Sequence, residues 1–286
     1  MRYPLLISAI LFYFSGIPAW SSSAPPEPEE YKPVLELGVG LFTAWFPQYP
    51  AARENQTLTL PAPLVRLRTP IVKADREDGL RSLLMDGKNY TLTFSASGSF
   101  PAGSKDNPDR EGMPTLDLLM EFGPKLVYHA YRLRDEGKLD IHIPLRTVTS
   151  ASFDHIEEQG FTFSPYISWR DLNLLNTGHE FYFNFGATWA TRKLHSYFYE
   201  VRPEFVTADR SQHSAKDGFV GSYITMSYVI PLGMHNFYSF VGADFHSGAA
   251  NEDSPLFVNS TNYSVGVGMS WNLWKSKKLV KVNPSF

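Results

Sequence analysis

The sequence predicts an all-β fold, a transmembrane up-and-down antiparallel β-barrel of about ten strands, on three observations. Apolar and polar residues alternate with a period of two in one segment after another, as they do in strands with two unlike faces. Several of these segments exceed the five or six residues usual for strands of soluble sandwiches. The content of 15% aromatic and 19% charged residues, with a mean hydropathy of −0.22, is too polar for a helical membrane protein and too aromatic for a disordered chain.

The composition also excludes several classes of function. The 286 residues include no cysteine, which rules out disulfide scaffolds, thiolate metal sites and cysteine nucleophiles. The net charge of −3 supplies no broad basic field for nucleic-acid phosphates. We therefore expect no nucleic-acid partner, no metal and no cofactor.

The N-terminal segment is typical of a secretory signal peptide. Arg2 precedes an apolar run at 5–17 and a group of small residues at 19–24, which are the charged, hydrophobic and cleavage regions of such a peptide. A membrane anchor is the alternative, but the run is shorter than the roughly 20 apolar residues that span a bilayer. The predicted division of the chain is 1–23 signal peptide with cleavage between 19 and 24, 24–33 extended tail, 34–274 barrel, and 275–286 basic C-terminal tail.

The alternation is clearest near the C-terminus. At 262–273 the odd positions are apolar, as at Val265 and Val267, and the even positions are small or polar, as at Ser264 and Ser270. Ten segments are predicted as strands on this basis: 34–46, 58–68, 90–100, 115–131, 138–150, 159–170, 181–189, 218–231, 235–247 and 262–273. The stretch 69–87 is too long for a simple turn, and a further pair of short strands there would make twelve.

The polar faces of these strands carry charges that a soluble core would not accept. A barrel in lipid turns its apolar faces to acyl chains, and the polar faces then line a lumen where charges are hydrated or paired. The predicted lumen network is Glu36, Asp117, Glu121, Lys125, Asp140, His142, Arg146 and Arg170. Because about ten strands enclose only a narrow interior, we expect pairs such as Glu121 with Lys125 to plug it.

The connections between the strands support the same topology. From the third strand onward, long connections around 101–114, 191–217 and 248–260 alternate with short turns, such as the one at 134–137. Outer-membrane barrels show this asymmetry, with long loops outside and short turns in the periplasm. An even strand count then returns both termini to the periplasmic side.

Short motifs along the chain occur in the order found in a known family. They are Arg110-Glu111-Gly112-Met113-Pro114, Glu121-Phe122-Gly123-Pro124, Pro144-Leu145-Arg146, Tyr199-Glu200-Val201, Ala208-Asp209-Arg210, Gly218-Phe219 and Asp253-Ser254-Pro255-Leu256. Together, over 35–274, they resemble the MltA-interacting protein (MipA/OmpV) family of outer-membrane barrels. One departure is the basic tail that follows the last strand, where members usually end on an aromatic residue.

The resemblance implies a function as well as a location. It implies a protein of the Gram-negative outer membrane, embedded in its lipid, that acts as a non-enzymatic scaffold for cell-wall enzymes. In the founding members the partners are a lytic transglycosylase and a peptidoglycan synthase. Other members are associated with adhesion, osmotic response or antibiotic susceptibility, so a narrow solute channel and a surface adhesin stay open as alternatives.

An enzymatic role is a further alternative. Histidines lie beside serines or aspartates in the predicted outward loops, namely His155 with Asp154, His195 with Ser196, and His213 with Ser211 and Asp209. Neither a G-x-S-x-G motif nor an H-x-x-x-H motif accompanies them, and both motifs mark catalytic or metal sites. Ordinary loop polarity therefore explains these residues better, and we expect no enzyme.

Overall fold

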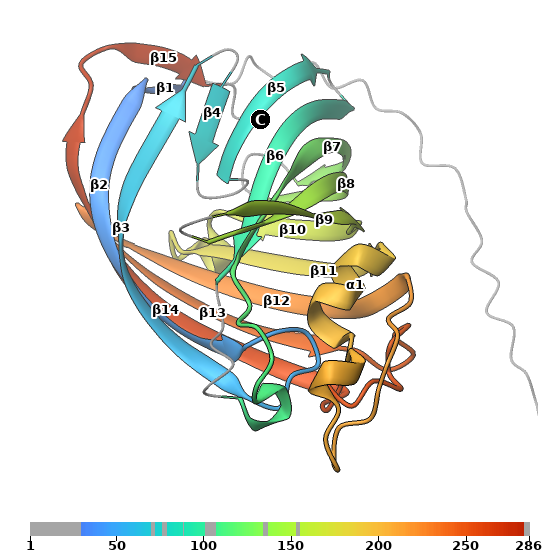
Figure 1. Ribbon diagram of the computed structural model, residues 1–286. Helices are drawn as coiled ribbons and strands as arrows, with labels where there is room; N and C mark the ends of the chain where they lie inside the picture. The colour runs from blue at the N-terminus through green and yellow to red at the C-terminus, as the bar shows by residue number, and fades with distance from the viewer. Residues whose placement is uncertain are drawn as a thin grey trace, which may run out of the picture.

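The computed structural model describes residues 30–69, 72–75, 79–87, 89–100, 107–133, 137–152 and 155–282. The predicted signal peptide, 1–23, lies outside the described residues. Within them, strands dominate, joined by one α-helix and short 3-10 turns (Figure 1). No helix of this part of the chain has the length and apolar character needed to cross a membrane.

The strands of the large sheet are β2 (Leu35–Pro47), β3 (Asn55–Arg68), β4 (Val72–Asp75), β5 (Gly79–Asp86), β6 (Tyr90–Ser99), β7 (Leu118–Leu133), β8 (Gly137–Ala151), β9 (Ile156–Phe163), β10 (Tyr166–Asp171), β11 (Glu180–Ala190), β12 (Gly218–Leu232), β13 (His235–Phe245) and β14 (Thr261–Lys275). The two terminal strands, β1 (Glu30–Pro33) and β15 (Leu279–Val282), pair only with each other. The helical elements are η2 (Pro108–Arg110), η3 (Leu174–Asn176), α1 (Arg192–Tyr199) and η4 (Pro203–Phe205).

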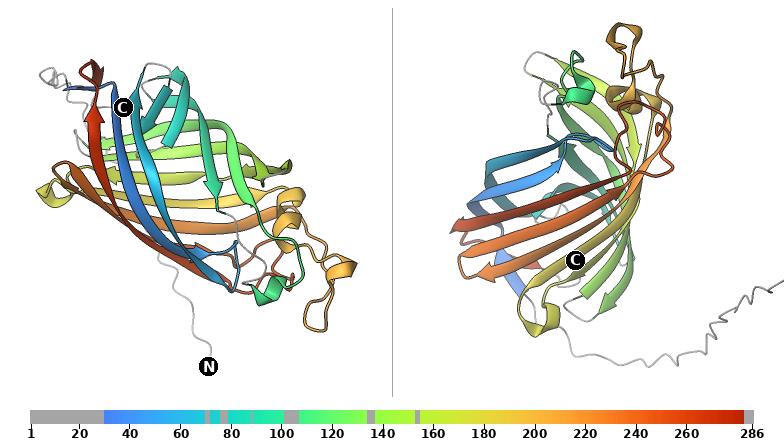
Figure 2. Two further views of the ribbon diagram at one scale, coloured as in Figure 1. Left: turned by 60° about the vertical axis from the view of Figure 1, so that its left-hand side comes forward. Right: turned by 90° about the horizontal axis from the view of Figure 1, so that it is seen from below.

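The large sheet closes into a barrel of antiparallel strands (Figures 1 and 2). The last long strand, β14, pairs with the first, β2. Strands β9 and β10 are one crossing of the wall, because both keep the same register against β8 and against β11. Pro165, which has no N–H to donate, lies at the break between them. The described residues thus form twelve wall strands, the higher of the two counts considered from the sequence, with β4 and β5 supplying the extra pair.

The faces of the strands follow the predicted alternation. Val39, Phe185 and Val267 on the outer face are 46%, 47% and 49% exposed, whereas Lys125 and Asp140 on the inner face are buried. Exposed apolar side chains around the whole wall are what a surface in contact with acyl chains requires. The chain forms a β-barrel with an apolar outer face and a polar inner face, as the period-two pattern predicts.

Glycines on the lumen face make room for aromatic rings. A Cβ on Gly268 would overlap the ring of Phe42, and one on Gly266 would overlap Phe240. The ring of Phe42 in turn lies 5.6 Å from that of Tyr238. The small residues of β14 therefore accommodate bulky lumen side chains contributed by neighbouring strands.

The wall is incomplete on one side. Strand β3 pairs with β2 along its whole length, but its other edge pairs only at Leu67 and Arg68, with the short β4. Likewise, Ala96–Ser99 of β6 pair only with β7. Pro61 and Pro63 of β3 lack N–H groups, which is typical of an edge strand. Among the described residues, these parts of β3 and β6 have no ladder partner on that side and their ribbons stand apart (Figure 1). We call this interruption of the hydrogen-bond ladder the opening.

The register assigned to β11 can be tested by placing a charge on each of its faces. We expect Phe185→Arg to lower the free energy of unfolding by about 2–4 kcal/mol, because its side chain meets lipid near mid-membrane. Asn184→Arg on the lumen face should cost far less. Urea unfolding in phospholipid vesicles measures both, and an equal loss at the two positions would contradict the register, since a one-residue slip exchanges the faces.

Candidate functional site

One group of charged side chains ties four neighbouring strands together inside the outward half of the lumen. The carboxylate of Glu121 on β7 lies 3.8 Å from the guanidinium of Arg146 on β8 and accepts a hydrogen bond of 3.1 Å from Thr162 on β9. Arg146 Nε also donates to Ser95 Oγ on β6 at 3.3 Å. The expected pair of Glu121 with Lys125 does not form, because residues four apart on one strand are separated by about 13 Å.

A second group lies nearer the chain termini. The Asp140 carboxylate accepts from His129 Nδ1 at 2.9 Å and from Arg132 Nη1 at 2.8 Å, with Lys138 Nζ at 3.9 Å. The other ring nitrogen of His129 bonds Thr91 at 2.9 Å. Charged side chains are accommodated in a confined interior when they form ion pairs and their remaining polar atoms are hydrogen-bonded.

The remaining predicted lumen residues are spread over the barrel. Glu36 pairs with Arg68 at 2.6 Å and with Arg66 at 3.3 Å, both on the neighbouring strand β3. His142 stacks on Tyr166 with ring centroids 4.2 Å apart and bonds Ser168 at 2.8 Å. Arg170 and Lys125 are buried, the latter only 1% exposed. Asp117 precedes β7 and lies at the outward mouth, where its N–H donates to the Tyr197 hydroxyl at 2.6 Å.

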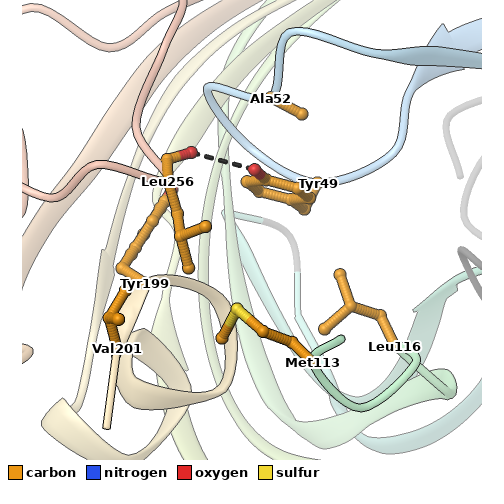
Figure 3. Packing of buried hydrophobic residues seen from close by; sticks show 7 residues of the cluster. All are labelled: Tyr49, Ala52, Met113, Leu116, Tyr199, Val201 and Leu256. Carbon is orange, nitrogen blue, oxygen red and sulfur yellow. Dashed lines mark hydrogen bonds between the residues drawn. The ribbon is translucent and has the colours of Figure 1, made fainter. Parts of the chain in front are cut away.

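The outward end is closed by loops that share a hydrophobic core of their own, which we call the cap. Its core combines residues from four connections that are far apart in the sequence (Figure 3). The members are Tyr49, Ala52, Met113, Leu116, Tyr199, Val201 and Leu256. Burial raises the pKa of Tyr49 to about 12 and that of Tyr199 even further, so both hydroxyls stay protonated and act as hydrogen-bond donors.

Hydrogen bonds between the loops fasten the cap. The Tyr49 hydroxyl donates to the Leu256 carbonyl and the Tyr199 hydroxyl to that of Pro50, both at 2.9 Å. Arg210 donates three bonds of 2.9 Å, to the carbonyls of Phe205, Asp109 and Glu111. Because one planar guanidinium holds both the 107–117 and the 191–217 segments, Arg210 is the main polar link of the cap.

The motif residues gather in two places. Those of the outward loops meet in the cap: Arg110 donates to the carbonyls of Phe198 and Pro114, and Ser254 Oγ donates to the Tyr199 carbonyl at 2.8 Å. Gly112 adopts a φ of 78°, a left-handed turn that favours glycine. The cap residues of the motifs are Arg110, Gly112, Met113, Pro114, Asp253, Ser254 and Pro255.

The other motif residues lie in the wall, where β7 meets β8. They are Gly123, Pro124, Pro144 and Arg146. A Cβ on Gly123 would overlap the carbonyl oxygen of Leu145, so glycine allows the two strands to approach closely there.

The histidines considered for catalysis make structural contacts. His195 Nε2 donates to the Gly218 carbonyl at 3.1 Å, and burial lowers its pKa. His213 Nε2 bonds Asn251 Oδ1 at 3.2 Å. His155 bonds Ser152 Oγ at 2.7 Å, but its other nitrogen lies 3.8 Å from Asp117, beyond the hydrogen-bond reach that orients a catalytic base. Asp154 lies outside the described residues.

Within the described residues, no group of His, Asp and Glu has the arrangement to hold a metal ion. Sequence reasoning did not identify the cap residues Tyr49 and Asn251, because loops show no periodicity. Only the tertiary structure reveals them, because each is buried although it lies in a loop.

The opposite end carries the paired chain termini. Strands β1 and β15 form a two-stranded antiparallel sheet, with Tyr31 opposite Lys281. Ser276 anchors this sheet to the barrel, since its N–H donates to the Leu35 carbonyl at 2.8 Å and its Oγ accepts from the Leu35 N–H at 3.2 Å. Five lysines belong to the sheet and its connection to β14: Lys32, Lys275, Lys277, Lys278 and Lys281. The sheet is therefore a basic surface at the end of the barrel where the termini meet.

Comparison with known proteins identifies a family. The profile of the family described as MltA-interacting protein MipA matches residues 39–273. No curated protein sequence matches the chain. The chain is similar to the NanC porin at 8% identity, covering 82% of this chain and 100% of that one, with a TM-score of 0.40.

Two other solved structures show the same level of likeness. An outer membrane channel from Pseudomonas putida F1 has 11% identity over 88% of this chain and 100% of that one, with a TM-score of 0.41. The outer membrane phospholipase A from Escherichia coli has 12% identity over 88% and 95%, with a TM-score of 0.36. At these values no argument about function follows from them.

The role of Arg210 in the cap can be tested by Arg210→Lys. A lysine ammonium cannot reproduce the three hydrogen bonds that the planar guanidinium of Arg210 donates. We therefore expect the cap to lose about 1–3 kcal/mol of local stability. Hydrogen exchange of the α1 and η2 amides should accelerate while the wall strands stay protected. The exposed Arg202→Lys is the matched control, and unchanged exchange in Arg210→Lys would show that the loops are held by their apolar core alone.

Proposed function

The chain belongs to the family described as MltA-interacting protein MipA, and from this premise we propose that it is a non-enzymatic outer-membrane scaffold that docks cell-wall remodelling enzymes at its periplasmic end. The proposed partners are a lytic transglycosylase, as the MltA of the family description, and a peptidoglycan synthase. The observation that carries the proposal is the basic β1–β15 sheet, which lies on the side of the short turns.

The geometry of that sheet suits a docking surface. Its residues are accessible, with Tyr31 54% and Leu279 53% exposed, and among the described residues each strand pairs only with the other. Exposed Lys277 and Lys278 favour a partner with an acidic patch, because complementary charge speeds encounter and orients the complex.

The filled lumen supports a scaffold over a solute conduit. The Glu121–Arg146 and Asp140–Arg132 pairs occupy the interior at two heights, and the cap lies over the outward mouth. A small barrel whose interior side chains are interlocked leaves little continuous water.

Planar-bilayer recording distinguishes scaffold from conduit. The scaffold predicts negligible single-channel conductance, both for the native chain and for Lys125→Glu. Steady conductance whose ion selectivity reverses in Lys125→Glu would favour the channel instead, because a current through the lumen must pass this buried cation.

Crosslinking and pull-down from Gram-negative envelopes tests the docking surface. We expect the native barrel to recover a lytic transglycosylase, and deletion of 277–286 to reduce that recovery at least fivefold. The deletion keeps Ser276 and hence its bonds to Leu35, so the barrel end stays intact. The double variant Lys277→Gln, Lys278→Gln keeps β15, so it distinguishes the contribution of positive charge from that of the strand itself. Full recovery of the transglycosylase with the deletion variant would place the docking site elsewhere.

A further inference from the structure

A cavity of about 370 Å³ lies inside the barrel beneath the cap. Side chains from α1, from the outward ends of several wall strands and from the loop after β2 line it. Its lining is largely apolar, with Leu119, Leu194, Phe198 and Val220 among the contributors. This volume falls within the range of pockets that hold small organic ligands.

The charges that line the cavity are of one sign. Asp117, Glu121 and Asp244 contribute carboxylates, whereas no lysine or arginine is among the described lining residues. Glu121 is engaged by Arg146 and Thr162. The carboxylate of Asp244, near the outward end of β13, has neither a hydrogen bond nor a salt bridge to any described residue. An unpaired carboxylate against an apolar wall favours a cation or a hydrogen-bond donor.

A buried histidine beside Asp244 presents a second acceptor. His246 lines the same cavity and is 4% exposed. Its Nδ1 lies 3.1 Å from the Val220 carbonyl, and since a carbonyl can only accept, Nδ1 carries the proton. In the neutral imidazole Nε2 is then an acceptor, and this buried atom has no partner among the described residues. Asp244 and His246 thus offer two acceptors and no donor.

The cavity also reaches the incomplete part of the wall. Ser99, the last residue of β6, and Phe100, which follows it, line the cavity. They lie at the end of the β6 edge that has no ladder partner towards β3. The ring of Phe100 lies 6.2 Å from that of Phe46, another lining residue on β2.

We propose that the cavity beneath the cap binds an amphipathic organic cation, with its apolar body against Leu119, Leu194 and Val220 and its ammonium group held by Asp244 and His246. This site is independent of the periplasmic docking surface. It gives the outward half of the barrel a ligand-binding function of its own.

Isothermal titration with octylammonium tests the proposal on the mature full-length barrel in phosphatidylcholine nanodiscs, with empty nanodiscs subtracted. Octyl sulfate and octyl glucoside, which share the chain but not the charge, are the comparison ligands. We expect octylammonium to bind at least tenfold more tightly than either. Asp244→Asn should weaken octylammonium binding about tenfold, which is the size expected for the loss of one hydrogen bond to a charged group. Glu204→Gln makes an equal charge change on the exposed surface of the cap and should leave the affinity unchanged.

A second variant tests the cavity itself. Thr188→Trp places a large ring among the lining residues and should abolish octylammonium binding, while heat-modifiable gel migration confirms that each variant is folded. Equal binding of the three amphiphiles, or equal affinity of Asp244→Asn and Glu204→Gln, would overturn the proposal. Binding that persists in Thr188→Trp would do the same, because it would locate the ligand in the bilayer rather than in the cavity.

Discussion

Hydrocarbon offers no hydrogen-bond partner to a backbone N–H or C=O group, and the rest of the structure depends on this constraint. A β-sheet in the bilayer can meet it only by closing on itself, so the first and last long strands must pair. The pairing of β14 with β2 does this over most of the length of both strands. Closure in turn creates an inner face that is hidden from lipid, and this face accepts the polar and charged residues that alternate with the apolar ones.

The closed barrel encloses a lumen, and side chains of the inner face occupy it. Ion pairs such as Glu121–Arg146 occupy part of it, and aromatic rings such as Phe42, lying over Gly268, occupy another part. Charges such as Glu36 and Asp140 find partners on a neighbouring strand, because side chains directly across a ladder lie close together. These interlocked side chains are the feature on which the proposed scaffold role rests.

The two ends of the barrel differ in the way their connections are organised. On the inward side short turns leave the termini as the prominent feature, and β1 and β15 pair there into a basic sheet. On the outward side long loops bury their own core around Tyr199 and Leu256. This core packs over the barrel mouth, above the cavity. The unpaired carboxylate of Asp244 and the unpaired Nε2 of His246 distinguish that cavity from the salt-bridged lumen below. The two proposed functions therefore belong to opposite ends and to different chemistry.

The sequence by itself determined the class of fold, the position of ten wall strands and the face that each residue presents, because a period of two is a local property of the chain. From the same alternation it predicted a set of charged lumen residues, and it left the strand count between ten and twelve. Only the tertiary structure decided that Glu121 meets Arg146 rather than Lys125, since partners across a ladder depend on strand register and not on spacing along one strand. The cap, the opening beside β3 and the pairing of the termini were likewise decided there, because loops and chain ends have no periodicity and acquire their contacts only when the closed barrel brings distant segments together.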